Sequence, residues 1–187
     1  MNIKKILELS LTIAAMKHDL RNKSPRLINR NRSKNFVEIL ADQLRKEYKD
    51  GSNIYVLSRH YNKNRKLFGL NELLYDILVF ETSPVLSIRK TKSLLSVTKA
   101  IWTIESELDN NSKEWIKDFN KLVLGSSVNK LFIGPQYKPE KEILCFLTKL
   151  AEHCNGNIFL ALVPYPRDLK PEALVHCWEF KKGWQEL

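Results

Sequence analysis

The chain has 187 residues, of which 43% are hydrophobic and 28% are charged. This composition suits one globular domain with a real core and excludes a chain that is disordered as a whole. The formal net charge is +10, and residues 1–34 alone carry nine basic residues against two acidic ones. Positive charge gathered in one segment favours a polyanionic partner, above all nucleic acid. The alternative is that the basic segment only keeps the protein soluble.

The three cysteines, Cys145, Cys154 and Cys177, are odd in number and form no C-x-x-C pair. This pattern indicates a reducing compartment, and we expect a cytoplasmic protein. A zinc site that combines them with His153 and His176 would need spacings that standard zinc sites do not have. No apolar run in the sequence approaches the length of a membrane span, so no membrane partner is expected.

The first part of the chain is predicted to contain two helices separated by a basic arm. Apolar residues at helical spacing predict a helix over residues 2–20. A proline and a polar, basic composition predict a loop or mobile arm over residues 21–35. Helical spacing resumes over residues 34–49. We therefore expect an N-terminal helix and basic arm over residues 1–33, followed by one α/β domain over residues 34–187.

The rest of the chain alternates between strand and helix patterns. Strands are expected, in chain order, at residues 53–61, 72–81, 96–107, 129–134, 157–166 and 173–180. A proline and several basic residues predict a turn or insertion over residues 82–96, and helices are expected over 112–125 and 138–154. Strand–helix alternation after residue 97 implies right-handed crossovers. The predicted fold is α/β, with a central mixed sheet and helices on both of its faces.

Three carboxylates, Asp76, Glu105 and Glu107, stand within or beside apolar strand patterns. A carboxylate in an apolar strand is costly unless it is paired, hydrogen-bonded or bound to a metal. Glu105 and Glu107 project to the same side of a strand, and Asp76 on a neighbouring strand can converge on them. Such oxygen ligands suit Mg²⁺ or Mn²⁺. The alternatives are a solvent-facing strand end for the glutamates and a pair between Asp76 and Arg59 or Arg89.

The order of these elements resembles the PD-(D/E)xK, or restriction-endonuclease-like, nuclease superfamily over about residues 34–134. In that superfamily a helix often offers an acid, and Glu38 matches that position. Asp76 matches the aspartate of the second motif, although Tyr75 and not proline precedes it. The segment Glu105-Ser106-Glu107 matches the third motif, (D/E)-x-K, with glutamate in place of lysine, as in some restriction enzymes of the superfamily.

The resemblance implies hydrolysis of DNA phosphodiester bonds with Mg²⁺ or Mn²⁺ as the cofactor. Asp76, Glu105 and the Ser106 carbonyl would bind the cation, while Glu107 would orient or deprotonate the attacking water. Glu38 would complete the acidic set. Loss of activity in a nuclease-like fold stays open, because the usual lysine is missing.

In other members of the superfamily the lysine has moved onto the following helix. Lys117 and Lys121 stand one turn apart on the helix after Glu107, and either would stabilise developing negative charge. The alternative for both lysines is a solvated helix face that forms ion pairs with Glu114 or Asp118.

Two basic clusters are candidates for nucleic-acid binding. The residues expected to hold phosphates are Arg26, Arg30, Arg32 and Lys34 in the predicted arm, and Arg59, Lys63, Arg65 and Lys66 in a predicted turn between strands. The expected partner is DNA, and the resemblance adds a homodimer and a setting such as defence against foreign DNA. A non-catalytic nucleic-acid-binding module and a protein that binds an acidic partner protein remain as alternatives.

Overall fold

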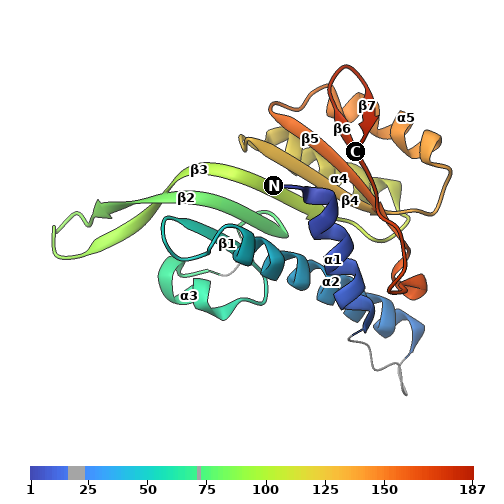
Figure 1. Ribbon diagram of the computed structural model, residues 1–187. Coiled ribbons are helices and arrows are strands. Elements are labelled where there is room, and N and C mark those ends of the chain that lie inside the picture. Colours follow the sequence, from blue (N-terminus) through green and yellow to red (C-terminus); the bar gives the residue numbers. More distant parts are fainter. Residues whose placement is uncertain (17–23, 71–72) are drawn as a thin grey trace.

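The computed structural model describes residues 1–16, 24–70 and 73–187, apart from the side chains of Pro25 and Arg26. The elements are α1 (Ile3–Met16), α2 (Pro25–Glu47), β1 (Ile54–Ser58), α3 (Asn62–Phe68), β2 (Ile77–Leu86), β3 (Ser93–Ser106), α4 (Ser112–Leu124), β4 (Asn129–Pro135), α5 (Glu140–Ala151), β5 (Asn157–Val163), the short 3-10 helix η1 (Pro166–Asp168), β6 (His176–Phe180) and β7 (Trp184–Glu186) (Figure 1). Among these described residues, no helix is both long and apolar enough to cross a membrane.

The strands form one seven-stranded mixed sheet in the order β1-β2-β3-β4-β5-β6-β7. Strands β3, β4 and β5 are parallel neighbours, joined by α4 and α5, and every other neighbouring pair is antiparallel. The predicted α/β class, the mixed sheet and the crossovers after residue 97 are therefore confirmed.

Alternation along the strands divides the core into two layers. Ile77 and Val79 of β2 pack in one cluster with residues of α1 and α2, whereas Leu78 and Phe80 pack in the other with residues of α4 and α5. Successive side chains of a strand point to opposite faces, so a continuous apolar strand is covered by helices on both sides. Helices thus cover both faces of the sheet.

The N-terminal region differs from the prediction. Helix α2 begins at Pro25, so the expected loop over residues 21–35 is wrong from residue 25 onward. The Ser24 side chain caps the helix by accepting a hydrogen bond from the N–H of Leu27, and a proline at the first helical position loses no intrahelical bond. The expected domain boundary at residues 33/34 falls inside this helix. Residues 17–23, the end of the predicted first helix and the start of the arm, lie outside the described residues.

The segment expected as a turn or insertion over residues 82–96 is a second correction. Strands β2 and β3 continue through it as a long hairpin, and the chain reverses only between Ser87 and Lys92. Pro84 is tolerated because β1 pairs with β2 only as far as Glu81, which leaves the rest of β2 on the sheet edge. Three further elements, α3, η1 and β7, were not expected from the sequence.

Candidate active site

Asp76 stands immediately before β2 and reaches the end of β3. Its Oδ2 atom accepts hydrogen bonds from the Ser106 N–H at 2.9 Å and from the Ser106 hydroxyl at 2.7 Å. Burial raises the pKa of the Asp76 carboxyl, and the two bonds from Ser106 oppose that rise. The alternative pairing of Asp76 with Arg89 is absent among the described ion pairs, because Arg89 lies in the turn at the far end of the β2–β3 hairpin.

Glu105 lies one residue before Ser106, so its side chain points to the opposite face of the sheet, towards α4. The side chain is only 1% exposed. Its Oε2 atom accepts a hydrogen bond from Lys121 Nζ at 3.0 Å, whereas its buried Oε1 atom has no hydrogen-bond partner. Burial first, and the negative charge of Asp76 second, raise the pKa of Glu105 to about 8. A solvent-facing strand end is therefore excluded for this glutamate.

Lys121 of α4 is the cation that meets the buried carboxylates. Its Nζ atom lies 3.0 Å from Glu105 Oε2 and 2.8 Å from Asp118 Oδ1. Burial lowers the pKa of Lys121, but the hydrogen bonds to Asp118 and Glu105 outweigh burial and raise it. Lys121 therefore stays charged between the two acids. The sequence suggested Asp118 only as a surface ion-pair partner of the lysines. Its i, i+3 spacing from Lys121 does not reveal that Glu105 also contacts this lysine.

Tyr75 helps to fix the end of α4 beside the site. Its hydroxyl donates to the carbonyl oxygen of Lys121 at 3.3 Å, and it leaves no room for a side chain at Gly125, where a Cβ atom would lie 2.5 Å from it. The residue before Asp76 thus holds the turn that carries the site lysine. No sequence signal marked Tyr75 as a site residue, apart from its place in the motif position that proline usually occupies.

Lys117, the other candidate lysine, lies one turn before Lys121 on α4. Its side chain is exposed and forms an ion pair with Glu114 at 3.0 Å. Among the described ion pairs, Glu105 and Asp118 contact Lys121 and not Lys117. The predicted alternative of a solvated helix face describes Lys117, whereas it does not describe Lys121.

Glu107 lies just beyond the end of β3. Its N–H donates to the Ile133 carbonyl at 3.0 Å, and its Oε1 atom accepts a hydrogen bond from the N–H of Asp109 at 2.8 Å. Burial raises the pKa of the Glu107 carboxyl, while the bond from Asp109 opposes the rise. Because β3 ends at Ser106, the strand alternation that was expected to align Glu105 with Glu107 stops between them.

Glu38 of α2 is held by the chain that follows β1. Its Oε2 atom accepts a hydrogen bond from the Ser58 hydroxyl at 2.8 Å, and its Oε1 atom accepts one from the N–H of His60 at 3.0 Å. Arg45 donates to the same Ser58 oxygen at 2.5 Å. These bonds fix the carboxylate of Glu38 in a cavity of about 250 Å³ that Asp76 also lines.

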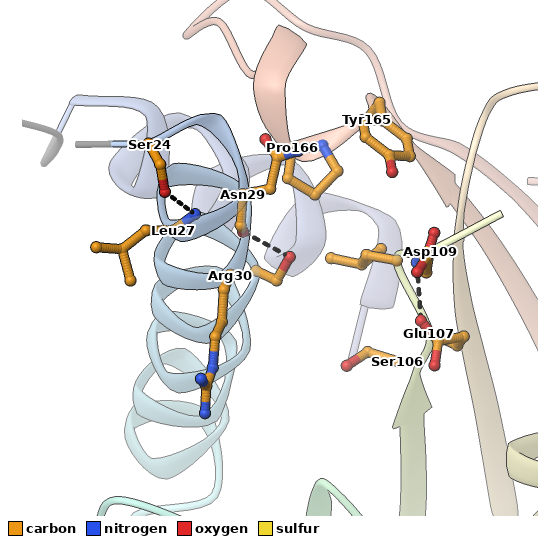
Figure 2. Close-up of a pocket in the computed structure, with 11 residues that line it drawn as sticks. Ser24, Leu27, Asn29, Arg30, Ser106, Glu107, Asp109, Tyr165 and Pro166 are labelled. Atoms are coloured by element: carbon orange, nitrogen blue, oxygen red, sulfur yellow. Dashed lines mark hydrogen bonds between the residues drawn. The ribbon is translucent and has the colours of Figure 1, made fainter. Parts of the chain in front are cut away.

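That cavity adjoins a larger one of about 750 Å³, and the two share the lining residues Arg30, Ser33 and Ser106. Together they form a groove between α2 and the end of β3, which we call the α2–β3 groove. Figure 2 shows Arg30 on α2 and, across the larger cavity, Ser106 and Glu107 at the strand end. Acidic side chains thus line a groove that basic side chains border.

Apart from Arg32, the predicted nucleic-acid-binding residues fall into three groups. Those that line the groove are Arg30, Lys34 and Arg59. Those that lie exposed on α3, outside the cavity lining, are Lys63, Arg65 and Lys66. The side chain of Arg26 lies outside the described residues.

Arg32 is a correction to the predicted phosphate contacts. Its side chain is 7% exposed, and its Nη1 atom donates to the carbonyl oxygens of Pro166 at 2.8 Å and Arg167 at 2.7 Å. The guanidinium therefore holds η1 against α2 and does not face a ligand. A long side chain can bury its stem and still satisfy its charge on backbone carbonyls, so a basic sequence pattern does not imply a basic surface.

The carboxylates Asp76 and Glu105 fit a divalent cation in donor type. Among the residues that the structure describes, no group of three or more His, Cys, Asp and Glu side chains is arranged to hold a metal ion. The two carboxylates nevertheless offer hard oxygen donors, and the buried Glu105 Oε1 atom has no hydrogen-bond partner. A buried acceptor without a partner is unusual and marks a place where a cation would be stabilising.

Comparisons with protein-family models and with curated proteins find no match for this chain. The function is therefore inferred from the residues and from their geometry.

Proposed function

We propose that the chain is a metal-dependent DNA endonuclease of the PD-(D/E)xK type. The observation that carries this proposal lies at the end of β3, where Ser106 is bonded to Asp76 and the neighbouring Glu105 is paired with Lys121 of the following helix. The order α2–β1–α3–β2–β3–α4–β4 supports a restriction-endonuclease-like fold, with an antiparallel β1–β2–β3 unit and β4 parallel to β3. Glu38 on α2 supports the same assignment from the helix that precedes the sheet.

Asp76 and Glu105 would hold Mg²⁺ or Mn²⁺, with the Ser106 carbonyl as a further ligand. A bound cation of this kind lowers the pKa of a water ligand and neutralises negative charge on the scissile phosphate. Ser106 fixes Asp76 through two hydrogen bonds, so this ligand is oriented before any cation binds.

Two neighbouring side chains would carry out the other steps of hydrolysis, which are charge stabilisation and proton transfer. Lys121 keeps its charge beside Glu105 and would stabilise the negative charge that develops on the phosphate oxygens. Glu107 borders the α2–β3 groove, and burial raises the pKa of its carboxyl, which makes its carboxylate a stronger base for the proton of the attacking water. This division gives the role of the missing motif lysine to Lys121 and leaves Glu107 free to act as a base.

The groove has the charge that a DNA backbone needs. Arg30, Lys34 and Arg59 line it together with Asp76, and basic side chains along a groove bind phosphates without reading base sequence. We propose that these residues hold the strand whose phosphate lies at Asp76. Cutting of both strands would require a second copy of the chain, so we propose a homodimer on duplex DNA.

The test is cleavage of plasmid and linear DNA with Mg²⁺, with Mn²⁺ and with a chelator. Asp76→Asn and Glu105→Gln remove one charge each, and Glu152→Gln is the matched control, because Glu152 is an exposed acid beyond α5. We expect cleavage to fall at least about 100-fold in the two site variants and to stay within about twofold of wild type in the control. Metal-dependent cleavage that survives both site variants would contradict the assignment of these carboxylates.

A non-catalytic nucleic-acid-binding module is the second candidate. It is favoured by the burial of Glu105 and by its ion pair with Lys121, since a paired carboxylate can also serve stability alone. This candidate predicts no cleavage, with salt-sensitive DNA binding that is equal in the wild type, Asp76→Asn and Glu105→Gln.

A further inference from the structure

Residues 82–99 form a two-stranded ribbon, the β2–β3 arm, which extends from the body of the molecule (Figure 1). The pairing of β1 with β2 ends at Glu81, and the pairing of β4 with β3 begins only at Trp102. In the described part of the chain, no other strand pairs with either edge of this arm. Leu95 packs against the core, but most side chains of the arm are exposed, so its surface is available to a partner.

The arm is strongly basic. It contains Arg89, Lys90, Lys92 and Lys99 and no acidic residue, so eighteen residues supply four of the ten net positive charges of the chain. All four side chains are exposed, and none forms an ion pair with another described residue. Unpaired positive charge concentrated on a projecting element attracts a polyanion.

The turn at the end of the arm is ordered by Ser87. Its N–H donates to the Lys92 carbonyl at 2.8 Å, and its hydroxyl oxygen accepts hydrogen bonds from the N–H groups of Thr91 at 3.3 Å and Lys92 at 3.2 Å. These bonds present Ile88, which is fully exposed, beside the basic residues of the turn. A large apolar side chain at the tip of a basic ribbon needs a partner with both phosphates and an apolar surface.

A second copy of the chain fits the arm poorly. Packing two arms against each other would bring eight positive charges together with no acid on either arm, and like charges across paired strands are destabilising. Duplex DNA offers the opposite charge. A two-stranded ribbon fits its major groove, and apolar side chains can also insert between base steps from the minor groove.

We propose that the β2–β3 arm is a DNA-binding ribbon, with Arg89, Lys90 and Lys92 on the phosphates and Ile88 inside a groove. Ser93 and Ser106 are thirteen residues apart on β3, which corresponds to at most about 43 Å along an extended strand. That length equals about 13 base pairs at about 3.4 Å per base pair. The arm would therefore grip the duplex about one helical turn away from the α2–β3 groove.

The proposal shares its ligand with the proposed nuclease, but it is tested by binding and not by cleavage. The assay is fluorescence anisotropy of the full chain with a labelled duplex of about 24 base pairs, in chelator, over a range of salt concentrations. The test variant is R89A/K90A/K92A, and the matched control is K141A/K149A/K182A, which removes three exposed lysines from α5 and the β6–β7 turn. Ile88→Ser tests the apolar contact with no change in charge, and melting temperatures check that all variants fold.

We expect R89A/K90A/K92A to bind at least about tenfold more weakly than the wild type, and its salt slope to fall by up to about 2.7 because three phosphate contacts are lost. The control should stay within about threefold, and Ile88→Ser should bind about three- to tenfold more weakly with an unchanged salt slope. Equal losses in the two triple variants would overturn the proposal, since net charge alone would then explain binding. So would a dimer that Ile88→Ser dissociates while DNA affinity is unchanged.

The two proposals fail separately. If the arm variant loses DNA binding and the wild type never cleaves DNA, the arm stands and the nuclease falls. If the wild type cleaves DNA and the arm variant binds and cleaves as well as the wild type, the nuclease stands and the arm falls.

Discussion

Replacing Glu105 by Gln tests the electrostatics of the site through stability alone. The substitution keeps the shape of a side chain that is 1% exposed, and it removes the charge that faces Lys121 at 3.0 Å. Burial and the charge of Asp76 raise the pKa of Glu105 from an ordinary 4.5 to about 8. Between these two values the folded protein holds a proton on Glu105 that the unfolded chain has lost.

The sign of the effect follows from this difference in bound protons. A proton held only by the folded state stabilises it, so the contribution is complete below about pH 4.5 and disappears as the pH rises through about 8. At about 1.4 kcal/mol per pH unit, the wild type should lose about 3 kcal/mol of unfolding free energy between about pH 6 and about pH 9 through Glu105 alone. The glutamine variant has no proton to lose at this position, so it should lack this dependence.

The measurement is urea denaturation followed by tryptophan fluorescence, for the wild type and Glu105→Gln at several pH values. Subtracting the two unfolding free energies at each pH cancels the other titrating groups. We expect the wild type to lose about 3 kcal/mol relative to the variant across this range. A difference that does not change with pH would refute the reasoning, because it would show that the ion pair with Lys121 keeps Glu105 charged throughout.

Further predictions concern the neighbours of the buried carboxylate. Lys121→Met should reduce DNA cleavage at least about 100-fold. Lys117→Met, whose side chain is exposed and pairs with Glu114, should stay within about twofold in the same gel assay. Glu107→Gln should slow cleavage at least about 100-fold because the attacking water loses its base, and a rate within about twofold of wild type would contradict that role. Ser106→Ala removes one of the two hydrogen bonds that lower the pKa of Asp76, so the pH optimum of cleavage should move to higher pH. If circular dichroism shows that the variant does not fold, the hydrogen bond has only a structural role.

Local patterns predicted the elements whose formation depends on local forces. In α4, Trp115, Phe119 and Leu122 recur at helical spacing and are all buried, while the Asn111 side chain caps the first turn by accepting from the N–H of Lys113. The parallel β3–β4–β5 unit followed from strand and helix alternation, since a parallel pair needs a crossover. These features needed no knowledge of distant contacts.

The errors came from segments that distant contacts decide. Residues 25–35 appear too polar for a packed helix, but Arg32 is buried because the carbonyl oxygens of Pro166 and Arg167, more than 130 residues away, accept its hydrogen bonds. Pro84 suggested a break, although a proline is harmless where no third strand continues the sheet beside it. Neither outcome can be predicted from a window of neighbouring residues.

The choice between Lys117 and Lys121 shows the same limit at the site. The two lysines are four residues apart, so they lie on similar sides of α4 but about 6 Å apart along its axis. Only the position of α4 along β3 decides which lysine reaches Glu105. In the structure, Lys121 forms this ion pair. The pairing of Asp76 with the end of β3 was predictable, in contrast, because it needs only two neighbouring strands.

The excess of acid over base at the site finally links metal binding to pH. Lys121 is paired with Glu105 and Asp118, and burial together with the negative charge of Asp76 raises the pKa of Glu105 to about 8. A divalent cation would relieve the same excess, so proton and metal compete for the Glu105 carboxylate. Affinity for Mn²⁺ should therefore rise up to about tenfold per pH unit below about pH 8, with the release of about one proton. Calorimetric titration with Mn²⁺ in two buffers of different ionisation enthalpy measures that release, and Glu105→Gln should abolish it. Binding to the wild type without proton release would show that the cation binds elsewhere or that Glu105 is already ionised.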